Sequence, residues 1–215
     1  MNYLTIVNNV LRRLRETQVT SIAQTPYSAL IGDFVNDAKT IVDSAWKWSQ
    51  YREAITQATA IADKSYSVVG TGRGATFVNV INDTSDAMMT YKTPTWFDIA
   101  NNVSTPATGS PVYYTFRGTD SNGDVVVEVY PIPDAVYSII FNVVKDPVDL
   151  EEEADELAIP HQPVIQLAYG MSLRERGETG GQSAVEQFAV AETFLSDAIS
   201  LDAAKNPEEL LWRVV

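Results

Sequence analysis

The most restrictive feature of this sequence is a change in hydrophobic period along the chain. Apolar residues recur with a helical period of about 3.6 over residues 1–50, alternate with a period of 2 over residues 51–148, and return to the helical period over residues 157–205. Amphipathic helices must bury their apolar stripes against a partner, so the first and third segments are expected to pack together. The pattern predicts an α+β fold, in which a discontinuous four-helix bundle carries an inserted antiparallel β domain.

The clearest helical stripe lies in residues 27–48. Thr25 and Pro26 precede it, and this pair combines a capping hydroxyl with a proline at the first helical position. A capping box at Ser183–Glu186 marks the start of another helix. We expect that helix to bury a stripe that includes Val185, Phe194 and Leu201. The four expected helices span residues 2–15, 27–48, 160–177 and 183–205.

The alternating segment reads as a series of short strands separated by turn residues. Asn122-Gly123 favours a two-residue hairpin turn. Residues 95–98 are expected to add a short helical turn, and the polar run at 101–110 an exposed loop. The expected strands are residues 53–61, 66–69, 76–81, 88–91, 112–116, 125–130 and 136–144.

Two further segments lie outside the bundle and the β domain. Residues 149–156 read DLEEEADE and are expected to form a solvated acidic linker. Residues 206–215 are expected to form an extended C-terminal arm, because Asn206-Pro207 ends the last helix. Large apolar residues crowd this arm, so it should dock, either on its own bundle or on another chain.

The composition excludes several classes of function. The chain has no cysteine and one histidine, which excludes disulfides, thiolate chemistry and most zinc sites. No apolar run reaches the length of a membrane span, and no secretory signal is expected, so the protein should be soluble and intracellular at synthesis. The formal net charge of −13 disfavours gripping nucleic acid. That charge serves either solubility alone or a surface that lies near DNA without adhering to it.

Three motifs imitate binding or catalytic sites and do not meet their requirements. The glycine-rich stretch 70–74 lacks the following helix and the GK[ST] of a phosphate loop, so a flexible hairpin loop is expected. The stretch 120–124 lacks the glycine and glutamate positions of an EF-hand, so a hairpin turn is expected. His161 has no neighbouring nucleophile motif. We therefore expect no catalytic residue, no cofactor and no bound metal.

A few exposed side chains are candidates for contacts with partners. Arg12 and Arg13 suit the carboxyl end of a helix, and they also suit an acidic neighbouring subunit. Arg73 is expected at the tip of its loop. The Trp46-Lys47-Trp48 triplet suits either core packing or stacking on bases or sugars.

Four stretches of sequence together resemble a known family. They are MNYLTIVNNVLRRLRE, LIGDFVNDAKTIVDSAWKWS, VVVEVYPIPDAVYSIIF and LAYGMSLRERGETGG, the last followed by an alanine-rich helix. These stretches resemble the head-to-tail adaptors of short-tailed phages, also called tail tubular protein A or gatekeeper proteins. The similarity extends over essentially the whole chain, and it lies in patterns of packing and turns rather than in a catalytic signature.

The resemblance implies a structural protein of the virion, located at the head–tail interface after assembly in the host cytoplasm. The family forms a homo-oligomeric ring, expected to be a dodecamer, beneath the portal protein. This ring extends the channel through which DNA passes without specific binding, and it receives the tail nozzle or fibre proteins. By the same resemblance a C-terminal arm docks on the portal, here through Pro207, Leu210, Leu211, Trp212, Arg213, Val214 and Val215.

Two alternatives remain open at the level of the sequence. One is a carbohydrate- or ligand-binding β module on a helical stalk, which would use Trp96, Tyr113 and Tyr114. The other is a neck or stopper protein of a long-tailed phage.

Overall fold

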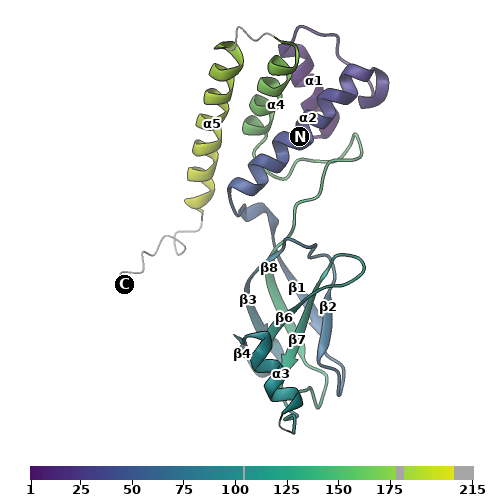
Figure 1. The fold of residues 1–215 in the computed structure, drawn as a ribbon, viewed down its shortest axis with the longest axis vertical. Helices are drawn as coiled ribbons and strands as arrows, with labels where there is room; N and C mark the ends of the chain where they lie inside the picture. The colour runs from purple at the N-terminus through teal and green to yellow at the C-terminus, as the bar shows by residue number, and fades with distance from the viewer. Residues whose placement is uncertain (104, 178–181, 206–215) are drawn as a thin grey trace. The chain divides into compact units, whose positions relative to one another are not determined.

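The computed structural model describes residues 1–103, 105–177 and 182–205, and its fold is mixed α+β, as predicted (Figure 1). The chain forms two compact units. The helical unit contains Met1–Gln50 and the chain from Val148 onward, and the β unit contains Tyr51–Pro147. The change of unit coincides with the change of hydrophobic period, because helix faces and strand faces bury their apolar residues in separate cores.

The helical unit contains α1 (Tyr3–Arg13), α2 (Pro26–Ala45), α4 (His161–Glu175) and α5 (Gln182–Ala203), with a short 3-10 turn, η1 (Ile22–Gln24). Side chains cap the first two helices. The Asn2 carboxamide accepts a hydrogen bond from the Thr5 amide at 2.9 Å. Thr25 and Ser28 form a reciprocal capping box, with Pro26 as the first helical residue. These caps satisfy amides that have no partner within the helix.

The core of this unit lies among α1, α2 and α4, where apolar side chains at helical spacing are fully buried. Its best-buried members include Ile6, Val7, Val10, Ile31, Val35, Val42 and Val164. Figure 1 shows α4 between α5 and the other two helices, and α5 packs chiefly along α4. A closed four-helix bundle would require α5 to share the core of α1 and α2, so that detail of the prediction is not confirmed.

The second helix ends earlier than predicted. The chain leaves the helix at Trp46, which adopts an extended conformation, and a 3-10 turn, η2 (Ser49–Tyr51), follows. The indole of Trp48 folds back into the core, and its Nε1 donates to the Val42 carbonyl at 2.9 Å. Because this bond satisfies one of the last carbonyls of α2, Trp48 closes the helix instead of extending it.

The β unit is built from two four-stranded sheets. One has the order β1 (Arg52–Ala58), β8 (Ser138–Val144), β3 (Thr76–Asn82), β4 (Ala87–Met88). The other has the order β2 (Ser65–Val68), β7 (Val125–Tyr130), β6 (Tyr113–Thr119), β5 (Thr90–Tyr91). Residues from both sheets form one core, in which the rings of Phe77 and Phe116 lie 4.8 Å apart.

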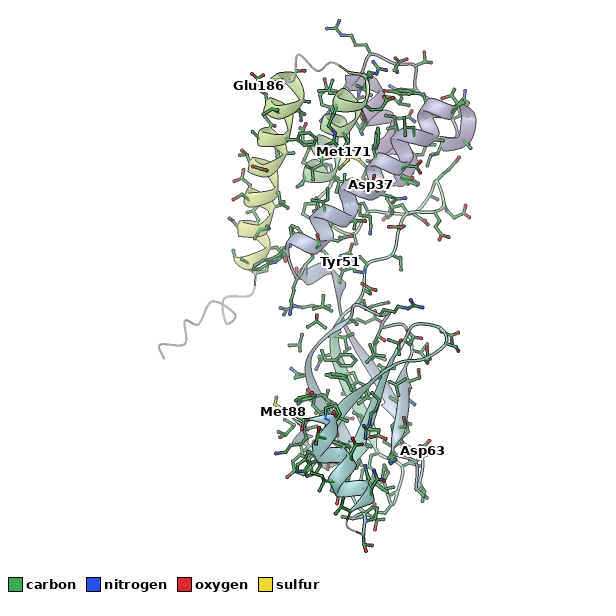
Figure 2. The ribbon with its side chains drawn as sticks, viewed as in Figure 1. Asp37, Tyr51, Asp63, Met88, Met171 and Glu186 are labelled. Carbon is green, nitrogen blue, oxygen red and sulfur yellow. The ribbon has the colours of Figure 1, made fainter. Side chains whose placement is uncertain are left out.

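Two parts of the β unit differ from the prediction. The expected strand 88–91 is split, because β4 pairs with β3 in one sheet while β5 pairs with β6, in parallel, in the other. Met89 lies buried at the crossing between them, and Met88 next to it is exposed (Figure 2). The expected short turn at 95–98 is a full helix, α3 (Pro94–Asn102), capped by Thr93 and anchored by the buried Phe97.

Candidate assembly surfaces

The two arginines predicted at the end of α1 have different environments. Arg13 Nη1 donates to Gln166 Oε1 of α4 at 2.7 Å, and burial lowers the pKa of Arg13. Arg12 is exposed and donates to Asn9, one turn earlier on the same helix. Arg13 therefore links α1 to α4. Arg12 has no acidic partner among the described residues and remains a candidate contact.

The loop that carries Arg73 is held by carboxylates. Asp124 Oδ1 accepts from the amides of Gly70 and Gly72, at 2.9 and 3.2 Å. Asp146 Oδ2 accepts from the Gly74 amide at 3.0 Å. A phosphate bound by this loop would need hydrogen bonds from these same amides. The two carboxylates already accept those bonds, so they occupy the positions that a phosphate would take. The prediction of a hairpin was wrong, because β2 and β3 on either side of the loop belong to different sheets.

Arg73 itself is exposed and lies against Gly123, the glycine of the neighbouring turn. It lines an open groove of about 430 Å³, together with Phe77 of β3 and Phe116 of β6. A cation beside half-buried aromatic rings is a candidate protein contact, and the residues that line the groove include no cluster of reactive groups.

The stretch that imitates a calcium loop is a turn, as the sequence indicated. Asp120 accepts hydrogen bonds from the Ser67 hydroxyl and from the amides of Asn122 and Asp124, the amides at 2.8 and 2.9 Å. The bond from Ser67 is the main cause that lowers the pKa of Asp120. Nowhere among the described residues do three or more His, Asp or Glu side chains gather closely enough to hold a metal ion.

The aromatic residues considered for ligand binding do not share one face. Trp96 of α3 packs against Tyr113 and Tyr130, with ring centroids 5.2 and 5.3 Å apart. The Lys92 ammonium lies 5.2 Å from the Tyr113 ring. Tyr114 follows Tyr113 on a strand, so it points the opposite way, and it is buried in the core. The proposed trio of Trp96, Tyr113 and Tyr114 is thus not assembled as a binding surface.

The acidic segment 149–156 contacts the start of α1. The carbonyls of Asp155 and Glu153 accept from the amides of Tyr3 and Leu4, at 2.9 and 3.2 Å. Leu150 is buried, and its backbone exchanges two hydrogen bonds with the Asn36 side chain, each 3.0 Å long. The backbone of this segment is thus part of the helical unit, although most of its carboxylates face solvent.

Hydrophobic periodicity predicted the wrong buried residues for α5. The stripe expected to be buried included Val185, Phe194 and Leu201, but all three are exposed. The apolar residues of α5 that are buried against the rest of the unit are the small ones, Ala184, Ala191 and Ala198. Their regular spacing of seven is visible in the sequence and was the available signal, because small residues at that spacing allow two helices to approach closely.

The predicted portal-binding residues from Pro207 to Val215 lie outside the described residues. None of the described helices is long and apolar enough to cross a membrane.

The comparisons with known proteins concern the chain as a whole. The family model described as SU10 adaptor protein matches residues 1–207. No curated protein matches the sequence.

Proposed function

The chain belongs to the SU10 adaptor protein family, and from that membership we propose that it is a structural head-to-tail adaptor of a tailed phage. The match confirms the resemblance to phage head-to-tail adaptors, and it extends over nearly the whole chain, from residue 1 to 207 of 215. This is the observation that carries the proposal. The family is one of structural adaptors, and we infer that the protein works by assembly, as a component of the virion at the head–tail junction.

In the proposed assembly, copies of the chain form a ring, which we expect to be a dodecamer, beneath the portal. The ring extends the DNA channel, and each copy of the chain contributes its helical unit and its β unit as two domains. The formal net charge of −13 favours passage of DNA without binding, because carboxylates near the channel repel phosphates. The exposed loops of the β unit, with Arg73 among them, would face the tail nozzle or fibre proteins.

The attachment to the portal is assigned to the C-terminal arm. Large apolar residues occupy five of its last six positions, and Trp212 with Arg213 supplies the residue types that anchor protein interfaces. An arm of this composition gains most when its apolar side chains enter pockets on another protein.

A truncation tests this assignment. A chain that stops after Asn206 should keep the circular dichroism spectrum and unfolding temperature of the full chain, and should lose cosedimentation with the purified portal protein. The matched control is Arg73→Ala, which alters the β unit and should leave attachment to the portal unchanged. Normal attachment of the truncated chain would refute the role of the arm. Failure of the full chain to bind its portal would refute the adaptor function itself.

A further inference from the structure

One helix of the helical unit has more apolar surface than its neighbours cover. Along α5 the residues Ala184, Ala191 and Ala198 are buried, while Val190, Phe194 and Leu201 are 43, 38 and 72% exposed. The buried alanines form the first apolar seam of α5. The three exposed residues Val190, Phe194 and Leu201 are called here the second seam, and they follow the spacing i, i+4 and i+11. At 100° per residue they fall within about 40° of one another on the helix surface.

The second seam needs a partner. A helix that is apolar on more than one face is normally buried on more than one face. Here α5 packs chiefly along α4, where Phe188 lies against Gly170. The three exposed side chains lie along one side of the helix, with the exposed Asp197 in the interval between Phe194 and Leu201. Apolar side chains aligned on one side of a surface helix mark an interaction site.

Charges around the second seam indicate what kind of surface covers it. Glu186 and Asp197 are exposed and lie beside the seam, and α5 contains no Lys or Arg. Glu186 stands in the first turns of the helix (Figure 2). The complementary surface should therefore carry cations opposite the first turns of α5.

The chain itself carries such cations at the matching height. Gln166 Oε1 of α4 accepts from Arg13 of α1 at 2.7 Å and from Gln187 of α5 at 2.6 Å. This shared acceptor places the last turn of α1 and the first turns of α5 at the same level along α4. Figure 1 shows α1 and α5 on different sides of α4. Arg12 and Arg15 at that end of α1 have no acidic partner among the described residues.

We propose that the second seam of α5 is covered by a second copy of this chain, placed side by side so that Glu186 of one copy meets Arg12 of the next. The contact joins two different faces of the chain, so it repeats from copy to copy and closes a ring when the rotation allows. The proposal rests on the proposed adaptor function for its setting, and it names the surface by which neighbouring subunits recognise each other.

Substitutions on two faces of α5 test the seam. Phe194→Asp places a charge in the second seam, and Val185→Asp places the same charge on the opposite flank, where Val185 is 68% exposed. Both side chains are solvent-accessible in a single copy, so both variants should unfold at the wild-type temperature. Phe194→Asp should reduce the number of copies bound to the portal at least tenfold, and Val185→Asp should not. Equal assembly of the two variants would overturn the proposal.

Cross-linking tests the pairing of copies directly, because the natural chain contains no cysteine. A chain carrying both Arg12→Cys and Glu186→Cys, assembled on its portal and treated with a short bismaleimide, should give a ladder of multimers on a denaturing gel. Each single variant should give no ladder, since identical positions do not meet in such a contact. The charge-reversed pair Arg12→Glu with Glu186→Arg should assemble, whereas each reversal alone should not.

The remaining outcomes separate this inference from the adaptor function. Attachment to the portal without any ladder would refute the seam and leave the function standing. A ladder among free copies at high concentration, with no binding to the portal, would refute the function and not the seam. If truncation after Asn206 and Phe194→Asp lowered the unfolding temperature of the single chain equally, the chain's own C-terminal segment would be the occupant, and the proposal would be wrong.

Discussion

Tyr3 is a buried residue whose pKa is affected by nearby carboxylates of this acidic chain. Its side chain is 5% exposed, and its hydroxyl accepts from Asn36 Nδ2 at 3.3 Å. Burial, and after it the nearby carboxylates of Asp33 and Asp149, raise the pKa of Tyr3 to about 12. The phenol thus has a strong preference for its neutral form in the folded protein.

This preference predicts a loss of stability in alkaline solution. The phenol of an unfolded chain titrates near pH 10, and that of folded Tyr3 near pH 12. Below pH 10 the phenol is protonated in both the folded and the unfolded state, and the contribution of Tyr3 to stability is fully present. Between pH 10 and 12 the unfolded state ionises first, so stability falls as the pH rises. Urea unfolding at pH 8, 10 and 11.5 should show a smaller loss for Tyr3→Phe than for the wild type.

Other tyrosines contribute to the alkaline loss in both proteins. Burial also raises the pKa of Tyr66 and Tyr114, which remain in the variant. The informative quantity is therefore the difference in the free energy of unfolding between wild type and Tyr3→Phe. It is compared at each pH with the same difference at pH 8. Parallel curves across the whole range would show that Tyr3 does not titrate as its buried position requires.

At the scale of elements, Asp202 holds the last turn of α5 to the segment that follows α2. An acidic residue near a helix C-terminus is unfavourable on its own, because it faces the negative end of the helix dipole. Here Trp46 Nε1 and the Ser49 amide donate to Asp202 Oδ2 at 3.1 and 2.9 Å. Burial acts to raise the pKa of Asp202, and the hydrogen bonds from Ser49 and Trp46 outweigh it, so the pKa is lowered.

Removing this charge should weaken the helical unit. Asp202→Asn keeps the shape of the side chain and loses charge-assisted hydrogen bonds, so we expect a cost of about 1–3 kcal/mol in the free energy of unfolding. Asp197→Asn, exposed on the same helix, is the control and should change stability by less than about 0.5 kcal/mol. Urea unfolding of both variants decides, and equal effects would exclude the role assigned to Asp202.

The pH dependence of stability gives a second test of the role of Asp202. Because the folded pKa of Asp202 is depressed, its contribution is complete above the unfolded value near 3.9 and is lost as the pH falls through the folded value. The destabilisation caused by Asp202→Asn should therefore shrink in acid.

Periodicity predicted where most helices and strands lie, but it could not predict which neighbours they would find. Alternation at 88–91 looks the same whether the residues form one strand or cross between two sheets at Met89. The end of α2 depends on a hydrogen bond from the Trp48 indole to Val42, which no local pattern encodes. The helix α3 was underestimated, although Thr93-Pro94 is a recognisable start signal.

The candidate contact residues show the same limit. Arg12 and Arg13 are adjacent in sequence and identical in type, and only the distant Gln166 distinguishes them by engaging Arg13. The sequence context of the glycine-rich loop near Arg73 argued against a phosphate loop, because no helix follows it. Its carboxylate partners, Asp124 and Asp146, lie far along the chain and could not be paired with it in advance.

At the scale of the whole molecule, the two units meet the conditions for independent folding. The β unit begins and ends at one place, since the Lys145 amide donates to the Tyr51 carbonyl at 2.8 Å and Arg52 pairs with Val144 across β1 and β8. An inserted domain whose ends are adjacent leaves the host able to close around it. Its core is also complete in itself, because every buried residue of the apolar cluster comes from its own two sheets and the crossing between them.

The isolated segment 51–147 should therefore fold alone. A segment of about 100 residues with its own core is of ordinary domain size, and we expect cooperative unfolding with a stability of roughly 5 kcal/mol or more. The helical remainder, with 52–145 replaced by a short Gly-Ser connection, should give a helical spectrum and a second cooperative transition. Circular dichroism and urea titration of both fragments are the measurements. If the β segment alone were unfolded, its sheets would need the helical unit for stability, and the insertion would have to be treated as one cooperative body with its host.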